Sequence, residues 1–169
     1  GKSEGTEIKF QISNFKFQID VFTTRADTLF GCTYLVLAPE HPMIQNLKSQ
    51  ITNFKYVENY IEESKKKTER ERIAEIKEKK GVELKGVTAI NPVNNRKIPI
   101  FVADYVLIYY GTGGIMAVPA HDQRDWDFAK NYNLPIIEII KPIQNTEYRI
   151  QNTEGAYEGE GILINSERF

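Results

Sequence analysis

A threonine-rich stretch near the start of the chain brings hydroxyl, guanidinium and carboxylate groups close together in sequence. It reads Thr23-Thr24-Arg25-Ala26-Asp27-Thr28. A threonine hydroxyl donates one hydrogen bond and accepts two, so these side chains could orient a water molecule or a substrate oxygen. A structural role accounts for the same residues: Asp27 or Thr28 caps a following helix, and Arg25 pairs with Asp27 at the surface. Composition alone favours the structural role.

A glycine-rich segment lies later in the chain and reads Gly111-Thr112-Gly113-Gly114. Glycines allow positive φ angles and a close approach of the backbone to a ligand. A nucleotide-binding fingerprint requires wider spacing and a helix directly afterwards, whereas a strand-like apolar stretch follows here at 115–118. The segment therefore predicts a bulge or bend in a sheet, which is compatible with ligand contact.

Two carboxylates three residues apart enter a predicted helix in the segment His121-Asp122-Gln123-Arg124-Asp125. They could bind an ammonium group through charge-assisted hydrogen bonds, or a divalent cation together with His121. Alternatively, Asp122 is the helix N-cap and Asp125 the first-turn acid, which is the favoured role for the segment alone. A metal site has too few ligands nearby, so no metal is predicted. Cys32 lies among apolar residues and is interpreted as a core residue.

The elements that must position these segments are mostly short strands. Residues 15–22 alternate, with Phe15, Phe17, Ile19 and Val21 on one face, which predicts a half-buried strand. Further strands are predicted at 34–38, 87–90, 98–102, 106–110, 115–118, 136–140 and 162–164. The sequence also predicts a hairpin turn at 94–96 and a helix at 125–133. This pattern predicts an α+β fold, a β-barrel-like mixed sheet with peripheral helices.

Residues 55–80 are predicted to be a solvated helical segment, in one helix or two, with a narrow apolar face. Favourable i,i+4 pairs support it, namely Glu62–Lys66, Glu63–Lys67 and Glu75–Lys79. Gly81 stands where a C-terminal cap is expected. The lysines could suggest an RNA-binding arm, but glutamates are interleaved throughout, so a solvated helical face is favoured.

Length and composition indicate one globular domain spanning 1–169, because 41% of the 169 residues are apolar. The net charge of −1 argues against binding along an extended phosphate backbone, so an RNA partner would be contacted over a short stretch. A single cysteine excludes an internal disulfide and a Cys-based zinc site, and it favours a cytoplasmic or organellar-matrix setting. No signal-like or membrane-spanning run is found. The chain lacks an initiator Met, and we expect it to be excised from a longer protein.

Taken in this order, the motifs resemble the editing domain of bacterial-type leucyl-tRNA synthetases, which are class I enzymes. The resemblance covers nearly the whole chain and rests on residues 23–34, 38–42, 89–93, 98–100 and 110–125. Two positions depart from the family pattern: Ala26 stands where proline is usual, and Gly114 where alanine is usual. Both changes loosen the backbone slightly, and neither removes a functional group.

The resemblance implies a hydrolase that removes wrongly attached amino acids, with isoleucine, methionine or norvaline-type side chains, from tRNA(Leu). A hydrophobic pocket separates side chains that differ by one methylene by only about 1–3 kcal/mol, so a second selection step is needed. By resemblance, Thr28 is a size gate that excludes leucine. The implied catalytic residues have three roles. Thr23 and Thr24 position the ester and the water, and Arg25 and Asp27 hold the loop in shape. Asp125 binds the α-ammonium group.

The implied substrate-binding residues complete the predicted site. They are Thr28, Met116, Val118, His121, Asp122, Leu107, Ile108, Tyr110, Gly111 and Thr112. Among these, Met116 and Val118 line the amino-acid pocket, Asp122 lies beside Asp125, and residues 107, 108 and 110 receive the terminal adenosine largely through backbone groups.

The implied partners are the 3′-terminal adenosine of aminoacyl-tRNA(Leu) and the rest of a parent leucine–tRNA ligase, and adenosine or AMP-like ligands would fit the same pocket. No cofactor and no membrane partner are implied. The chain carries no nucleotide-activation signature, so it should not aminoacylate by itself. Three alternative functions remain: a non-catalytic module that holds adenosine or a free amino acid, a structural insertion without editing activity, and a carboxylate–histidine metal hydrolase.

Overall fold

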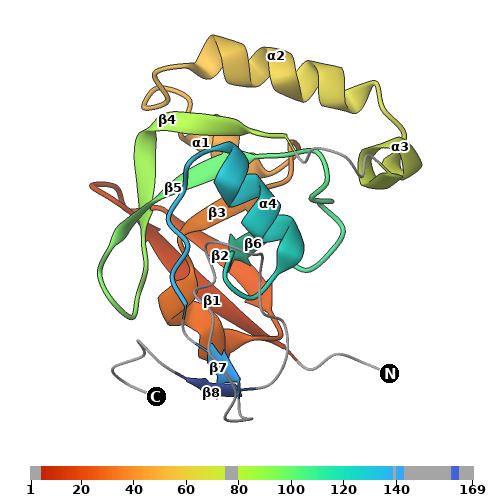
Figure 1. Ribbon diagram of the computed structural model, residues 1–169. Helices are drawn as coiled ribbons and strands as arrows, with labels where there is room; N and C mark the ends of the chain where they lie inside the picture. Colours follow the sequence, from red (N-terminus) through yellow and green to blue (C-terminus); the bar gives the residue numbers. More distant parts are fainter. Residues whose placement is uncertain (1–4, 75–79, 139, 143–160, 164–169) are drawn as a thin grey trace.

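A six-stranded mixed sheet forms the centre of the molecule in the computed structural model, which describes residues 5–74, 80–138, 140–142 and 161–163 (Figure 1). The strands are β1 (Thr6–Ile12), β2 (Gln18–Thr23), β3 (Tyr34–Leu37), β4 (Val82–Ile90), β5 (Lys97–Val102) and β6 (Gly114–Ala117). Their order in the sheet is β2-β1-β4-β5-β3-β6. Only the β3–β5 pair in this sheet is parallel among the described residues. The expected α+β class is confirmed.

The two edge strands of this sheet approach each other, which gives the sheet its barrel-like curl. β2 and β6 are in contact although no strand ladder joins them in the described residues. The Thr112 hydroxyl, just before β6, donates to the Asp20 carbonyl of β2 over 2.5 Å. A Cβ at Gly114 would lie 3.5 Å from the same carbonyl oxygen. The curl brings residues about 90 positions apart to one edge.

β3 is buried on both faces, which explains its unbroken apolar sequence. Leu35 and Leu37 belong to the larger core cluster together with residues of β1, β2 and β4. Tyr34 and Val36 face a second cluster that includes Phe128 of the helix α4 (Gln123–Asn131). The rings of Tyr34 and Phe128 stack with centroids 5.2 Å apart. α4 therefore packs directly against the strand behind the site.

The remaining helices lie around the sheet, as expected for peripheral helices (Figure 1). They are the 3-10 helix η1 (Ala26–Gly31), α1 (Pro42–Asn46), α2 (Phe54–Lys65) and α3 (Glu69–Ala74). α2 crosses above β4, and a separate pair of short strands, β7 (Ile140–Pro142) and β8 (Gly161–Leu163), lies at the opposite end of the view. No helix in the described part of the chain combines the length and apolar character needed to cross a membrane.

The predicted helical segment 55–80 contains two helices in its described part. Its exposed ion pairs have i,i+3 spacing instead of the predicted i,i+4 spacing: Lys55–Glu58, Lys65–Glu62 and Lys66–Glu63. Lys67 pairs instead with Asp104, over 3.0 Å. The predicted Glu75–Lys79 pair lies outside the described residues. Gly81 does not have the positive φ of a left-handed cap, so that prediction is wrong.

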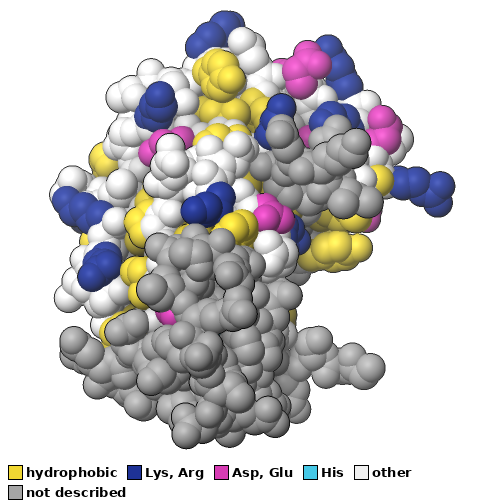
Figure 2. Space-filling model, in the orientation of Figure 1, with side chains coloured by type: hydrophobic (Ala, Val, Ile, Leu, Met, Phe, Trp, Pro, Cys, Tyr) yellow, Lys and Arg dark blue, Asp and Glu magenta, His cyan; other side chains and the backbone are white. Residues whose placement is uncertain are grey.

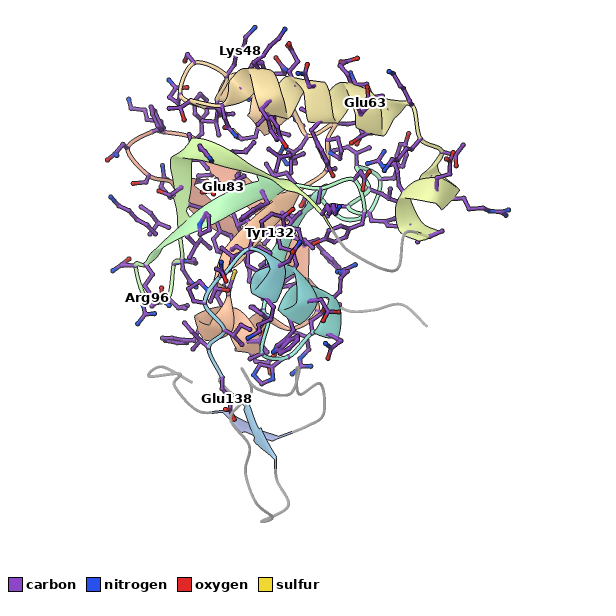
Figure 3. All side chains as sticks on the ribbon, turned by 45° about the horizontal axis from the view of Figure 1, so that its top comes forward. Lys48, Glu63, Glu83, Arg96, Tyr132 and Glu138 are labelled. Atoms are coloured by element: carbon purple, nitrogen blue, oxygen red, sulfur yellow. The ribbon has the colours of Figure 1, made fainter. Side chains whose placement is uncertain are left out.

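Gly81 has a different reason to be glycine. A Cβ there would lie 2.7 Å from the Val102 carbonyl oxygen. The Tyr132 hydroxyl, after the end of α4, donates to the Gly81 carbonyl and accepts from the Gly81 N–H, which joins α4 to the start of β4 (Figure 3). Close packing explains this glycine.

The predicted strand at 15–22 begins later than expected, because its first residues form the hairpin turn between β1 and β2. Ile12 N–H donates to the Phe17 carbonyl, and Asn14 has φ 69°. Phe17 is consequently exposed, whereas Ile19 and Val21 are buried as predicted. β1 itself is not among the predicted strands, although Ile8, Phe10 and Ile12 alternate within it.

The predicted strand at 106–110 is wrong, because the backbone turns there and a side chain bonds the carbonyls where the segment begins. Arg72 of α3 is buried and donates to the carbonyls of Asp104 and Val106 over 2.7 and 3.1 Å. The same guanidinium forms two bonds with the Glu40 carboxylate, at 2.7 and 3.2 Å. We call these four bonds the Arg72 clamp. The backbone turns at 104–105 and 108–109 instead of extending.

Other predictions near the site are accurate in type and differ in extent. The hairpin turn is confirmed: β4 and β5 are antiparallel with Ile90 opposite Lys97, and Arg96 marks the turn in Figure 3. The predicted helix at 125–133 is α4, which begins and ends two residues earlier. Residues 136–138 of the predicted strand at 136–140 are not in a strand, residue 139 lies outside the described residues, and residue 140 begins β7. Strand 162–164 corresponds to β8, and residue 164 lies outside the described residues.

Candidate functional site

A cavity of about 470 Å³ opens between the end of β2, η1, β6 and the start of α4. It is lined by Phe22, Thr23, Thr24, Arg25, Thr28, Ile115, Met116, Val118, His121, Asp122, Arg124 and Asp125. Its wall combines hydroxyl, carboxylate and guanidinium groups with apolar side chains. That combination suits a small ligand with an aliphatic part and a charged part.

The threonine-rich stretch forms one wall and is held by its own backbone contacts. The Thr23 hydroxyl accepts from Arg25 N–H over 2.9 Å. The Thr28 hydroxyl donates to the Arg25 carbonyl over 2.6 Å, and Thr28 is only 1% exposed. Arg25 pairs with Asp27 over 3.5 Å at the surface, as the structural interpretation predicts. The N-cap of η1 is Arg25, without a side-chain bond, so a cap by Asp27 or Thr28 is wrong.

The second wall carries the two aspartates at the start of α4. Asp122 is the N-cap, as predicted, and its Oδ1 accepts from Asp125 N–H over 3.0 Å. Asp125 is 4% exposed, and its Oδ2 accepts from Val118 N–H over 3.0 Å. The Tyr34 hydroxyl donates to the Asp125 carbonyl over 2.9 Å. Asp125 is therefore a buried carboxylate fixed from two sides beside the cavity.

Two buried groups behind the cavity remain protonated. Burial raises the pKa of the Tyr34 phenol, and the negative charge of Asp125 raises it further, so Tyr34 stays a hydrogen-bond donor. Burial likewise raises the pKa of the Cys32 thiol. Because the thiolate is the nucleophilic form, Cys32 is a core residue, as predicted, and not a nucleophile.

The glycine-rich segment forms a turn that leads into β6. Gly111 and Gly113 have φ of 57° and 77°, which favours glycine at both positions. A Cβ at Gly111 would lie 2.8 Å from the Cβ of Phe22, a residue that lines the cavity. The segment thus borders the cavity through Phe22 without lining it.

The structure brings together most of the predicted site residues and leaves others outside the cavity wall. Those that line it are Thr23, Thr24, Arg25, Thr28, Met116, Val118, His121, Asp122 and Asp125. Those that do not are Asp27, Leu107, Ile108, Tyr110, Gly111 and Thr112. Leu107 is buried and Tyr110 is exposed.

Three lining residues are not among the predicted site residues: Phe22, Ile115 and Arg124. Each directly precedes a predicted site residue in the sequence, and this position is the one feature that could have identified it as a lining residue. Arg124 lies 4.9 Å from the centroid of the Tyr105 ring, a cation–π contact. Among the described residues, no group of three or more His, Cys, Asp or Glu side chains is placed to hold a metal ion.

Comparison with known proteins identifies the family. The family model described as "Leucyl-tRNA synthetase, editing domain" matches residues 1–169. The chain belongs to this family. The editing domain is 50% identical over 167 residues to the leucine–tRNA ligase of Alkaliphilus oremlandii, covering 99% of this chain and 20% of that protein. It is 52% identical over 159 residues to the leucine–tRNA ligase subunit alpha of Aquifex aeolicus, covering 91% of this chain and 24% of that subunit.

A solved structure is similar to the editing domain in fold as well as in sequence. It is the crystal structure of the ternary complex of Agrobacterium radiobacter K84 agnB2 LeuRS with tRNA and LeuAMS. The TM-score is 0.69 at 36% identity, and the match covers 80% of this chain and 16% of that one. The chain therefore spans about a fifth of the length of the curated relatives it matches.

Proposed function

We propose that the editing domain hydrolyses the ester that joins a wrongly attached amino acid to the 3′-terminal adenosine of tRNA(Leu). The observation that supports this most strongly is the shared cavity. Threonine hydroxyls, a buried carboxylate and the side chain of Thr28 line one space of about 470 Å³. An aminoacyl ester offers an aliphatic side chain, a free ammonium and an electrophilic carbonyl, and each matches a group on the wall.

Asp125 is the proposed site for the α-ammonium. A buried carboxylate forms strong charge-assisted bonds to an ammonium group, and burial reduces screening by water. The Thr23 and Thr24 hydroxyls then orient the ester and a water molecule. The water oxygen adds to the carbonyl carbon, the bond between that carbon and the ribose oxygen breaks, and the ribose oxygen takes the proton that the water gives up. Positioning supplies much of the rate for an ester that is already activated.

Thr28 is the proposed size gate. It lines the cavity and is almost fully buried, with its hydroxyl fixed on the Arg25 carbonyl. A fixed side chain can exclude the γ-branch of leucine while admitting isoleucine, methionine or norvaline. Met116 and Val118 provide the apolar part of the same pocket.

The terminal adenosine is proposed to lie along residues 107–112. This segment borders the cavity through the contact between Gly111 and Phe22. We further propose that the domain acts within a complete leucine–tRNA ligase in the cytoplasm, which would supply the main grip on tRNA.

Deacylation of isoleucyl-tRNA(Leu) tests the proposal, with Asp125→Asn compared against Asp127→Asn. Asp125→Asn keeps an acceptor for Val118 N–H and removes the charge, so the rate should fall about 100-fold. Asp127 is exposed on the same helix and accepts from Gln123, so its variant should keep the wild-type rate. An adenosine-binding module without catalysis would show no deacylation in any of the three proteins. It would bind adenosine equally well in all of them.

A further inference from the structure

We propose that Asn91 is a specificity-positioning residue that holds the size gate Thr28 at its depth in the cavity. This inference rests on the proposed editing function and concerns a side chain outside the cavity wall. Asn91 follows β4, at the start of the β4–β5 turn, and is fully buried at 0% exposure. Its place in sequence is far from η1, which carries Thr28.

The Asn91 carboxamide connects the hairpin turn to the C-terminal end of η1. Its Nδ2 donates to the Leu29 carbonyl over 2.9 Å and to the Cys32 carbonyl over 3.3 Å. Its Oδ1 accepts from Val93 N–H over 3.1 Å. The Leu29 carbonyl also accepts from the N–H of Cys32, the C-cap of η1. The Asn91 side chain adds a second donor to that carbonyl and one to the carbonyl of the cap residue.

These bonds lie next to the gate. Leu29 is the residue directly after Thr28, and the Thr28 hydroxyl is bonded to Arg25 at the other end of the helical turn. η1 is therefore tied at its start by Thr28 itself and at its end by Asn91. A short 3-10 helix has poor internal hydrogen-bond geometry, so outside contacts must set its position. Losing the Asn91 donors would let the Thr28 backbone move away from the cavity.

An apolar core role does not explain this residue. A fully buried amide costs free energy unless its hydrogen bonds are satisfied, and Asn91 uses both donors and its acceptor on backbone groups. Its own backbone already closes the hairpin turn through bonds to Arg96 and Asn95. The two side-chain donor contacts, at Leu29 and Cys32, are thus with η1 and its C-cap residue.

The test measures deacylation of leucyl-tRNA(Leu) and isoleucyl-tRNA(Leu) by Asn91→Asp in the leucine–tRNA ligase that carries this chain. Asn91→Asp keeps the shape and the acceptor for Val93 but turns an oxygen toward the two carbonyls. The leucyl-to-isoleucyl rate ratio should rise about tenfold. Asn94→Asp is the matched control, because Asn94 Oδ1 accepts from Arg96 N–H in the same turn and does not reach η1. Its ratio should stay within about twofold of wild type.

A double-mutant cycle with Thr28→Ala separates positioning from general loosening. If Asn91 acts through the gate, Asn91→Ala should raise the ratio in the wild-type background and hardly change it once Thr28 is alanine. An unchanged ratio in folded Asn91→Asp, or fully additive effects in the cycle, would overturn the inference. Failure of both Asn91 variants to fold would overturn it too, since Asn91 would then serve the fold as a whole. If the wild type cleaves neither ester, the proposed function fails first and the inference fails with it.

Discussion

Tyr34 shows how a residue behind the cavity can act on one that lines it. Its ring stacks on Phe128, and its hydroxyl donates to the Asp125 carbonyl, both in the buried interior. Asp125 thereby has its backbone fixed by Tyr34 and its carboxylate fixed by Val118 N–H. A carboxylate held in this way is preorganised to receive an ammonium group.

Tyr34→Phe should therefore weaken the fold and the site together. The change removes one donor and leaves the buried Asp125 carbonyl without it, so the free energy of unfolding should fall by about 1–2 kcal/mol. Urea denaturation measures this, and the deacylation rate should fall with it. Tyr109→Phe is the control, because Tyr109 is 79% exposed and should show no change. Equal stability of Tyr34→Phe and wild type would contradict the role given to this hydroxyl.

Still at the residue scale, the sequence predicts hydrogen bonds and ion pairs between neighbouring residues well, and those between distant residues poorly. The Asp122 cap and the Arg25–Asp27 pair are local contacts, and both are confirmed. The bonds from Tyr34 to Asp125 and from Asn91 to Leu29 join residues 91 and 62 positions apart. No local pattern encodes such pairings, because they arise only when the sheet closes.

At the element scale, the segment that precedes the glycine turn shows why strand propensity can fail to predict a strand. Residues 106–110 are rich in β-branched and aromatic side chains, which favours a strand. The Arg72 clamp bonds the carbonyls of Asp104 and Val106, and a turn bond from Tyr110 N–H to the Leu107 carbonyl follows, so these contacts override propensity. Between them, α3 and the clamp fix the path of the chain into the proposed adenosine segment.

Glu40→Gln tests the clamp through its pH dependence. Burial is the largest single influence on the Glu40 carboxyl and would raise its pKa, but the hydrogen bond and charge of Arg72 outweigh it and lower the pKa. A lowered folded-state pKa gives stability above the ordinary carboxyl range and loses it as the pH falls through the folded-state pKa. Wild type should exceed Glu40→Gln in stability at pH 7, and the difference should shrink below about pH 4.

The control for this experiment is Glu63→Gln, because Glu63 and its partner Lys66 are both largely exposed. Such surface pairs contribute little, so this variant should match wild type at every pH. A stability difference for Glu40→Gln that stays constant down to low pH would show that the carboxylate charge is not what the clamp uses.

Gly111→Ala and Gly114→Ala form a matched pair within the glycine turn. Gly111 has φ 57°, and a Cβ there would press on Phe22, so Gly111→Ala should lower the free energy of unfolding by about 1–2 kcal/mol. It should also raise the KM for aminoacyl-tRNA, because the turn would move away from the cavity. At Gly114 the backbone is not left-handed, and a Cβ would meet the end of the Leu37 side chain at 3.1 Å.

Gly114→Ala should consequently change stability by less than about 1 kcal/mol and leave the KM unchanged. Thermal unfolding and steady-state deacylation measure the two effects. Similar losses in both variants would mean that the turn simply resists any side chain, and the specific contact with Phe22 would lose its significance.

For the whole molecule, the closing of the sheet is what assembles the site. Residues 23–28 and 115–125 meet because β2 and β6, the two edges of the sheet, come into contact. The order of motifs along the sequence does not by itself predict that meeting, whereas the resemblance to a known family does. The strands predicted at 34–38, 98–102 and 115–118 are confirmed, since each has a strong local signal. The order of the strands in the sheet cannot be predicted from such local signals and is known only from the folded structure.

Charge distribution at the same scale bears on how tRNA is held. Basic and acidic side chains of the described residues are interspersed on the face shown in Figure 2, and the net charge of the chain is −1. A surface of this kind releases few counterions on binding RNA. It is consistent with a domain that receives only the end of a tRNA, while other parts of a ligase hold the rest.

The most direct measurement is hydrolysis of isoleucyl-tRNA(Leu) and leucyl-tRNA(Leu) by wild type and Thr28→Ala. Thr33→Ala serves as the control, because Thr33 is equally a buried threonine and does not line the cavity. Wild type and Thr33→Ala should cleave only the isoleucyl ester, and Thr28→Ala should cleave both. No cleavage of the isoleucyl ester by wild type would contradict size-selective editing in this cavity. So would a Thr28→Ala variant that still does not cleave the leucyl ester.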